Sequence, residues 1–426
     1  MYDKIIRYRV ITMKKINKDS AAYIITVVLS LVLIFTGYRA IYPKIDGVAN
    51  EATSFKAKIV RLGEVEEMQM NVGTDTYNYK IIYFSARVLS GAQKGQTVDA
   101  AQIIDELYVI QQDEVKEGKK VLLCENADSN VNARYTFSEY VRTDALIVLG
   151  VVFCVLVVLF GGFKGVSTLL SLALTCMAVF LIFVPSVLAG MNVYFWSILV
   201  CVYITAMTLI LVNGLNAKSL AAATGCVGGV VVSGALMLFM NIFLVLTGNT
   251  DEHSIYLAQI NPDRPINLKA LIFAAIIIGA VGAIMDVAMS MASSLHELSE
   301  KNAKLTAKEL FASGLSIGRD IMGTMANTLV LAYIGSSLCT VLLLFVYDAS
   351  FMEIMNRELI ITEILQALVG SFGILFAIPL TAGVSALLYT GTRPRKSEKV
   401  HSAQNVKKSR LPESGTSADD YYNSLF

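Results

Sequence analysis

Residues 268–291 read LKALIFAAIIIGAVGAIMDVAMSM, and this stretch decides the class of protein. The run is long enough to cross a bilayer, which takes about 20 mainly apolar residues. Asp286 lies inside it, and Asp320 opens the next apolar run, 321–346. A carboxylate at membrane depth costs roughly 2.5–3.5 kcal/mol even on lenient insertion scales, so such groups usually face a partner, a cavity or a pathway. Two acids on consecutive spans therefore predict a protein that handles protons or a transported ion.

The composition of the 426-residue chain also indicates a membrane protein, with 55% hydrophobic and 16% charged residues. Soluble chains of this length carry more charge. A net charge of +1 argues against nucleic-acid binding. The six cysteines form no CxxC pattern, and we expect them to act as small apolar side chains. The sequence has no Walker A, Rossmann, GxSxG or HExxH motif, so we expect neither an enzyme nor a bound cofactor.

We predict an α-helical polytopic membrane protein with about eight transmembrane helices and a small β-rich extracytoplasmic domain. The eight apolar segments are 21–42, 144–162, 166–189, 193–213, 219–247, 268–290, 320–347 and 359–391. The first follows a basic tail, 1–20, and lacks a small-residue cleavage site. It is therefore interpreted as an uncleaved anchor helix rather than a signal peptide.

Basic residues mark the cytoplasmic side of a membrane protein. The tails 1–20 and 392–426 are both basic near the membrane, which places both termini in the cytoplasm and the segment 43–143 outside. The C-terminal tail is rich in Lys, Ser, Asn and Asp and is predicted to be disordered. The membrane domain, 144–391, is predicted to contain seven helices and a cytoplasmic loop, 291–319, that forms an amphipathic helix pair.

The hydrophilic segment 43–143 alternates apolar and polar residues in strand fashion at 55–60 and again at 79–84. Glycines at 73, 91, 95 and 118 separate the candidate strands. About 100 residues with five or six short strands predict a small β-barrel or sandwich. The sequence leaves open whether this domain is a cap, an assembly module or a ligand-binding domain.

Helical spacing gathers polar residues around each acid. Asp286 shares a face with Ser290, and Asp320 shares a face with Thr324 and Asn327. Paired carboxylates can share one proton or bind a cation, with the neutral side chains supplying further oxygens. The predicted ion, proton or substrate site therefore comprises six residues: Asp286, Ser290, Arg319, Asp320, Thr324 and Asn327. Whether it holds a metal is unknown.

A structural alternative remains open for both acids. Asp286 would form an ion pair with Arg319, and Asp320 would cap the N-terminus of its helix, where an acid suits the helix dipole. In that case Arg319 would be the counter-ion of Asp286. Two other interpretations of Arg319 stay open: it contacts an anion, or its side chain snorkels to the membrane interface.

Two segments carry a family resemblance. Residues 279–290, GAVGAIMDVAMS, and 313–329, SGLSIGRDIMGTMANTL, resemble the YibE/YibF-like family of bacterial multi-pass membrane proteins. Residues 83–99 resemble that family's extracytoplasmic region. The resemblance implies a location in the bacterial cytoplasmic membrane and draws attention to Asp286, Arg319, Asp320 and Asn327. It implies no substrate, because the family has no settled activity.

Three functions are weighed. The leading one is a secondary transporter or exporter of an ion or small polar solute, driven by a gradient or a separate partner because no ATPase motif is present. The second is a non-catalytic scaffold or regulator that engages envelope partners through 43–143. The third is an intramembrane aspartyl protease, disfavoured because its pattern requires glycine where Arg319 stands. The expected partners are the lipid bilayer and the solute, with no nucleic acid; a homo-oligomer or an envelope partner stays open.

Overall fold

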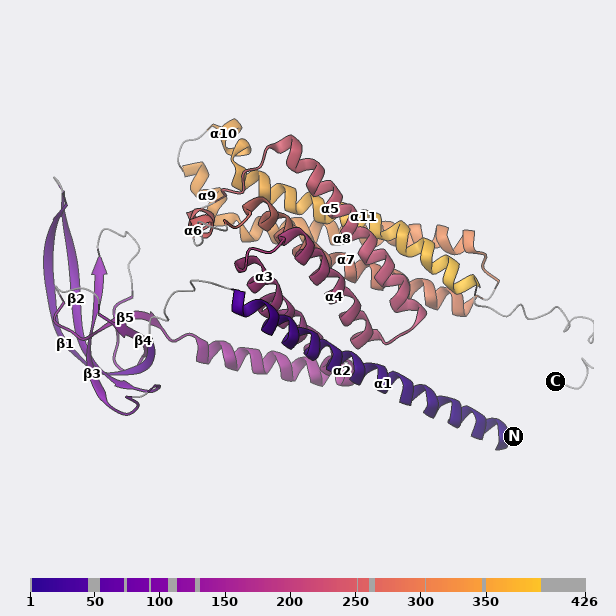
Figure 1. Cartoon of the computed structure of the whole chain (residues 1–426), viewed down its shortest axis with the longest axis horizontal. Helices are drawn as coiled ribbons and strands as arrows, with labels where there is room; N and C mark the ends of the chain where they lie inside the picture. Colours follow the sequence, from indigo (N-terminus) through magenta and orange to yellow (C-terminus); the bar gives the residue numbers. More distant parts are fainter. Residues whose placement is uncertain are drawn as a thin grey trace, which may run out of the picture. The chain divides into compact units, whose positions relative to one another are not determined.

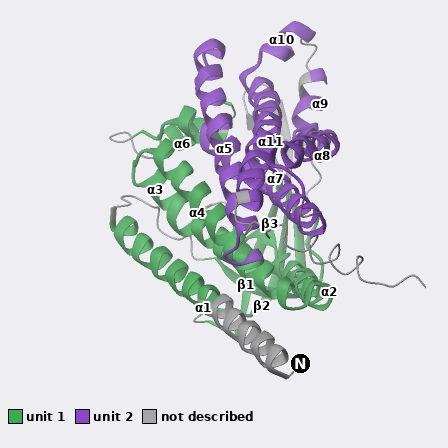
Figure 2. Ribbon diagram, turned by 90° about the vertical axis from the view of Figure 1, so that its right-hand side faces the viewer, with its two compact units in different colours: residues 1–212, 248–271 green, residues 213–247, 272–426 purple. Residues whose placement is uncertain are grey.

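The computed structural model describes residues 2–44, 54–72, 75–91, 93–105, 113–126, 131–250, 252–259, 265–302, 304–346 and 350–391. The chain divides into two compact units (Figure 2). Unit 1 comprises residues 1–212 and 248–271, and unit 2 comprises residues 213–247 and 272–426. The predicted disordered tail, 392–426, lies outside the described residues.

Unit 1 contains a five-stranded barrel, labelled in Figure 1. Its strands are β1 (Phe55–Val72), β2 (Asp75–Val88), β3 (Thr97–Asp105), β4 (Lys120–Glu125) and β5 (Tyr135–Tyr140). They close in the order β1-β2-β3-β5-β4, with β3 and β5 parallel and the other pairs antiparallel. A small five-stranded Greek-key barrel of this kind is the OB architecture. The predicted β-rich domain is therefore confirmed, as a barrel and not a sandwich.

The barrel interior is filled by side chains at alternate strand positions, as the period of a β-strand requires. Ala57 and Ile59 of β1 face inward beside Ile82 and Phe84 of β2, and all four are buried. The barrel is also tied to the helix that follows it. Lys120 forms an ion pair with Asp144 at the start of that helix.

The helices of unit 1 are α1 (Tyr2–Ile41), α2 (Thr143–Ala178), the π-helix η2 (Val179–Phe183), α3 (Val184–Leu188), α4 (Val193–Asn213) and α6 (Glu252–Gln259). The residues from 2 to 20 that were predicted as a tail continue α1 as helical backbone. Ile34 of α1, Leu174 of α2 and Met207 of α4 are buried together and form the helical core of this unit.

The α2 helix bends sharply at Gly162. Its φ of 55° is left-handed, a conformation that glycine adopts without a steric penalty. Beyond the bend the chain folds back, so that Gly165 lies against the carbonyl oxygen of Val157. The lack of a side chain at Gly165 makes this close approach feasible.

Unit 2 is built around α11 (Glu358–Gly391), which lies between α5 (Ala217–Leu244) and α8 (Ala307–Ser336) (Figure 2). Gly228 of α5 packs against Leu380, and Gly318 of α8 packs against Ile378. Because these two α11 residues lie about 200° apart around a helix, α5 and α8 occupy opposite faces of α11.

The fourth helix of this core is α7 (Leu268–Lys301), which packs on α5 and α11 through small residues. A Cβ at Gly229 would lie 2.7 Å from the carbonyl oxygen of Gly373 and 2.9 Å from Ile284. The hydroxyl of Ser233 donates a hydrogen bond of 3.1 Å to the carbonyl of Val369. Close approach through glycine and an interhelical hydroxyl bond are the usual means of association between helices in a membrane.

Six helices of the described residues are long and apolar enough to cross a membrane: Ala22–Ile41, Thr143–Leu188, Val193–Asn213, Ala217–Leu244, Leu268–Lys301 and Glu358–Thr390. The prediction of about eight was therefore wrong in number. The predicted spans 144–162 and 166–189 belong to one helical stretch that folds back at Gly162. The predicted span 320–347 is divided at Ser337 between α8 and the short α9 (Leu338–Val346).

The segment 291–319 is also organised differently from the predicted loop. Residues up to Lys301 continue α7, and α8 begins at Ala307, so a short connection replaces the separate helix pair. Thr306 and Glu309 form a capping box at the start of α8: Thr306 donates its backbone N–H to Glu309 at 2.8 Å, and the N–H of Glu309 donates to the hydroxyl of Thr306 at 3.3 Å. The local sequence Thr-x-x-Glu is the signature of this cap.

Candidate functional site

Asp286 lies in the interior of α7 on the side that the other helices of unit 2 leave exposed. Ile284, two residues earlier, is fully buried against Gly229 and Gly373. Two residues correspond to about 200° around a helix, so Asp286 points away from the packed core of unit 2. Ser290, one turn further on, is exposed on the same side, as predicted from helical spacing.

The space beside Asp286 is open. Gly282, one turn before Asp286, is exposed, and a Cβ built there would meet no other atom within 4 Å. Gly279, a further turn along the same face, is also exposed but has polar neighbours: a Cβ there would lie 3.1 Å from the hydroxyl oxygen of Tyr333 and 3.4 Å from Nε2 of Gln366. This face of α7 therefore presents the carboxylate of Asp286, and the phenol of Tyr333 and the amide of Gln366 lie two turns further along it.

Asp320, Thr324 and Asn327 share one exposed face of α8, as predicted. The opposite face packs on α11, where Leu329 covers Gly370. Asp320 and Leu329 are nine residues apart, which is about 180° around the helix. The Asp320 face therefore points away from α11. The hydroxyl of Thr324 donates to the carbonyl of Ile321 at 2.9 Å and keeps its oxygen lone pairs available as acceptors.

Contacts at both ends set the register of the α7–α8 hairpin. Leu295 of α7 lies against Gly314 of α8 near the connection, and Gly279 lies against Tyr333 far from it. Asp286 is nine residues from the first contact and Asp320 is six, which corresponds to about 13 Å and about 9 Å along their helices. Counted from the other contact, Asp286 is seven residues from Gly279 and Asp320 is thirteen from Tyr333, so the two acids differ by about 4–9 Å in level.

The carboxylates are nevertheless not joined. Within the part of the chain that the structure describes, no hydrogen bond or ion pair connects Asp286, Asp320 and Arg319 to one another. The alternative that Asp286 pairs with Arg319 is therefore not realised. Asp320 does not cap its helix either, because α8 begins at Ala307 with Thr306 as its N-cap.

Arg319 lies on a different face of α8 from Asp320. It is 14 residues before Tyr333, which brings the two to within about 40° of each other around the helix. The hydroxyl of Tyr333 lies against Gly279 on α7, the residue that starts the face of Gly282 and Asp286. The exposed guanidinium of Arg319 and the carboxylate of Asp286 therefore lie on the helix faces that meet at the Gly279–Tyr333 contact. Tyr333 was not among the predicted site residues. The only sequence signal for it was the glycine at position 279, which allows another helix to approach closely.

Other polar groups have structural roles. His296, near the end of α7, lies 3.1 Å from Glu300, and its ring contacts that of Tyr389. The hydroxyl of Tyr389 donates to the carbonyl of Ala292 at 3.1 Å. Among the residues described, no group of three or more His, Cys, Asp and Glu side chains could hold a metal ion.

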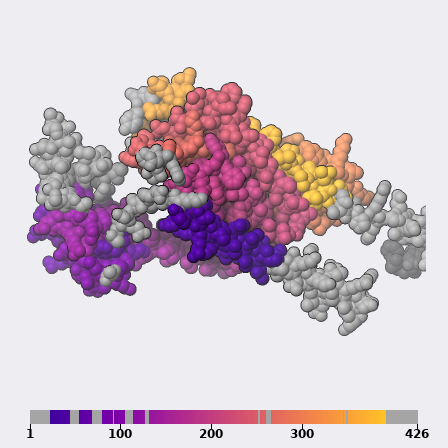
Figure 3. Space-filling model, in the orientation of Figure 1, coloured from indigo at the N-terminus to yellow at the C-terminus, as the bar shows by residue number. Residues whose placement is uncertain are grey.

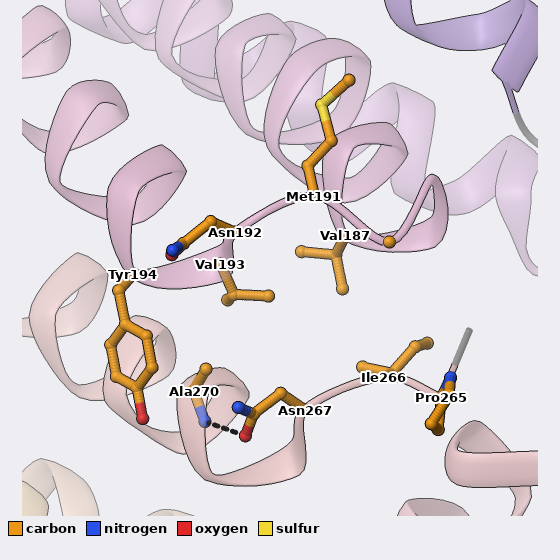
Figure 4. A pocket seen from close by; sticks show the side chains of 10 residues that line it. Val187, Met191, Asn192, Val193, Tyr194, Pro265, Ile266, Asn267 and Ala270 are labelled. Atoms are coloured by element: carbon orange, nitrogen blue, oxygen red, sulfur yellow. Dashed lines mark hydrogen bonds between the residues drawn. The ribbon is translucent and has the colours of Figure 1, made fainter.

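A separate pocket of about 220 Å³ lies in unit 1 between the α3–α4 turn and the residues preceding α7 (Figure 4). Asn192 accepts a hydrogen bond of 3.1 Å from the N–H of Phe195, and Asn267 accepts one of 3.1 Å from the N–H of Ala270. Both asparagines therefore cap helix N-termini at the pocket edge. None of the six predicted site residues lines this pocket.

These features define the class of protein: a multi-helix membrane-embedded protein with a small β-barrel near its N-terminus and a polar face on two helices of unit 2. The chain belongs to the YibE/F-like protein family, whose model matches residues 149–391. The match includes the α7 and α8 residues on which the resemblance was based, whereas residues 83–99 in the barrel fall outside it. Neither a curated protein nor a solved structure matches the chain.

Proposed function

We propose that this protein is a secondary transporter or exporter of an ion or small polar solute, with Asp286 as the group that exchanges the coupling proton or cation. The observation that carries the proposal is the position of Asp286: inside an apolar helix, on a face with open space at Gly282. A carboxylate at such a depth is costly unless it serves a pathway or a partner.

The surroundings of Asp286 supply the other parts of a solute path. Ser290 offers a hydroxyl one turn nearer the α7–α8 connection, and Tyr333 and Gln366 offer a hydroxyl and an amide about 10 Å further along α7. Arg319 adds a positive charge from α8. A solute with a cationic and an anionic end would find one carboxylate and one guanidinium that do not already neutralise each other.

In this proposal the protein lies in a bacterial cytoplasmic membrane with both termini inside and the barrel outside. The basic tails support that orientation. Asp320 belongs to a second polar face with Thr324 and Asn327, about 4–9 Å from the level of Asp286 along the helices. It would bind a cation or proton on its own face, because no contact joins it to Asp286.

The proposal is tested with a deletion strain exposed to a panel of metals, anions and osmolytes. The strain is complemented with wild type, Asp286→Asn, Asp320→Asn or Glu297→Gln at matched membrane abundance. Glu297 is the control because it is exposed on nearly the same face of α7 but close to the helix end. We expect wild type and Glu297→Gln to restore tolerance and Asp286→Asn to fail. Full rescue by Asp286→Asn would remove the carboxylate from the mechanism.

A second candidate, a scaffold that engages envelope partners, is favoured by one feature of the barrel. Strand β1 exposes apolar side chains, with Val60 and Val65 about half exposed. Under this reading the variant Val60→Glu, Val65→Glu would fail to complement while Asp286→Asn would succeed. The same complementation experiment therefore separates the two functions.

A further inference from the structure

A cavity of about 460 Å³ lies in unit 1 between α1, the segment around η2, and α4. It is lined mainly by apolar side chains, with contributions from Leu33, Gly37, Ala178, Ile182, Trp196 and Tyr203. None of these residues belongs to the polar faces of α7 and α8. The cavity is therefore independent of the proposed transport site.

The size and lining of this cavity determine what can occupy it. An engineered apolar cavity of about 150 Å³ stays free of water and binds small apolar molecules. The present cavity is about three times that volume and falls within the range of pockets that hold small ligands. If it stayed empty, its lining side chains would lose their dispersion contacts on one side. An apolar occupant restores those contacts.

The wall of the cavity has two unusual features. Ile182 belongs to η2, a π-helix, and such segments are rare and frequently lie at functional sites. Gly37 faces this wall: a Cβ at Gly37 would lie in van der Waals contact with Ile182, at 3.4 Å, and Gly37 also lines the cavity, so a larger side chain there would enter it. The buried hydroxyl of Tyr203 has no partner within hydrogen-bond geometry in the part of the chain that the structure describes. A polar end group of an occupant could satisfy it.

The position of the cavity suggests where the occupant comes from. The α1 residues from Ala22 onward form part of the surface of unit 1, drawn in indigo in Figure 3, and expose large apolar side chains such as Leu33 and Phe35. A second apolar groove of about 430 Å³ follows the other side of α1 along Phe35 and Met177. Hydrocarbon from the membrane therefore reaches α1 from its exposed side.

We propose that the cavity binds a single hydrocarbon chain, supplied by a membrane lipid or a free fatty acid, which completes the packing of α1 against η2 and α4. The chain lies along Leu33 and Gly37 on one wall and Trp196 on the other. Its polar end is directed to water, or to the hydroxyl of Tyr203 when the head group is small.

Trp196 gives a direct test, because it is the only tryptophan in the protein and it lines the cavity. The full-length protein in detergent micelles is titrated with a fatty acid brominated on its chain, and separately with a phosphatidylcholine brominated at the same position. Bromine quenches tryptophan fluorescence at close range. We expect saturable quenching at about one ligand per protein, and the more effective of the two probes identifies the source of the chain.

Two variants make the test specific. Gly37→Leu fills the cavity and should raise the half-saturating concentration at least tenfold, with Ala40→Leu as a second filling variant if the first is unstable. The double variant Phe195→Trp, Trp196→Phe moves the tryptophan to a neighbouring side chain that is 60% exposed, where quenching should rise in proportion to bromolipid without saturating. Proportional quenching in the wild type, or saturable quenching unchanged in both filled variants, would overturn the proposal.

Discussion

A pair of glycine-to-alanine substitutions tests the packing of unit 2. Gly225 of α5 lies against Thr381 of α11: a Cβ at Gly225 would approach the Thr381 hydroxyl oxygen, with 2.9 Å to its Cβ and 3.1 Å to its Cα. Contacts to Cβ and Cα cannot be relieved by rotating a side chain, so α5 and α11 must move apart. Gly282 of α7 is the matched control, because a Cβ there meets nothing within 4 Å.

The expected magnitudes follow from two opposing effects. Alanine is favoured over glycine inside a helix by about 1 kcal/mol, and both substitutions gain this. Overpacking a tight contact costs about 1–3 kcal/mol, and only Gly225→Ala incurs it. Gly282→Ala should therefore stabilise unit 2 by up to about 1 kcal/mol, and Gly225→Ala should be less stable than Gly282→Ala by about 1–3 kcal/mol.

The assay is reversible unfolding in mixed detergent micelles, followed by circular dichroism and fitted to a free energy of unfolding. Adding Thr381→Ala to Gly225→Ala removes the nearest atom and should recover part of the loss, which appears as a coupling in a double-mutant cycle. If Gly225→Ala and Gly282→Ala unfolded at the same detergent fraction, the close α5–α11 contact would be absent and the packing account would be wrong.

Two further predictions concern single interactions. Ser233→Ala removes the interhelical hydrogen bond to the carbonyl of Val369 and should lower the free energy of unfolding by about 0.5–1.5 kcal/mol in the same micelle titration; an unchanged value would mean that this hydroxyl is satisfied elsewhere. Hydrogen bonds from Thr306 hold the pKa of Glu309 below its usual value, so the carboxylate stabilises the first turn of α8 above about pH 4 and loses that effect as pH falls through the lowered pKa. Amides in this turn should exchange with deuterium more slowly in wild type than in Glu309→Gln at pH 6, and this difference should shrink as the pH falls through the lowered pKa of Glu309; a difference that did not change with pH would contradict the assignment.

Much of the helical core could be predicted from sequence because its segments are continuous apolar runs. The span 193–213 was predicted with the same bounds as α4, and the predicted start of 268–290 coincides with the start of α7. The C-terminal end of α7 was not predicted, because residues 291–301 are polar enough to resemble a loop. Their helix is maintained by packing, with Leu295 buried against Gly314 of α8.

The number of spans was wrong for reasons that hydropathy does not show. The predicted spans 144–162 and 166–189 form one helical stretch that folds back where Gly162 adopts a left-handed backbone conformation. Ser337 ends α8 within an otherwise apolar run. Both events depend on single residues, whereas a hydropathy pattern averages over about 20 residues.

The residues that share a helix face in the candidate site could be predicted from sequence, but the orientation of the α7 face relative to the α8 face could not. Helical spacing correctly placed Ser290 beside Asp286, and Thr324 beside Asp320. The rotation of each helix depends on which glycines pack, and the sequence alone does not decide whether Gly279, Gly282 or Gly318 does so. The structure shows that Gly282 has no neighbour within 4 Å of a built Cβ, that Gly279 lies against Tyr333, and that Gly318 is buried against Ile378.

The most direct test of the central claim is proton flux through the purified protein. Full-length wild type, Asp286→Asn and Glu297→Gln are reconstituted into liposomes that contain a pH-sensitive dye, and the solute identified by the deletion strain is added outside under an imposed pH gradient. We expect solute-dependent proton movement with wild type and Glu297→Gln, and none with Asp286→Asn. Equal proton movement in all three preparations would show that Asp286 does not couple transport.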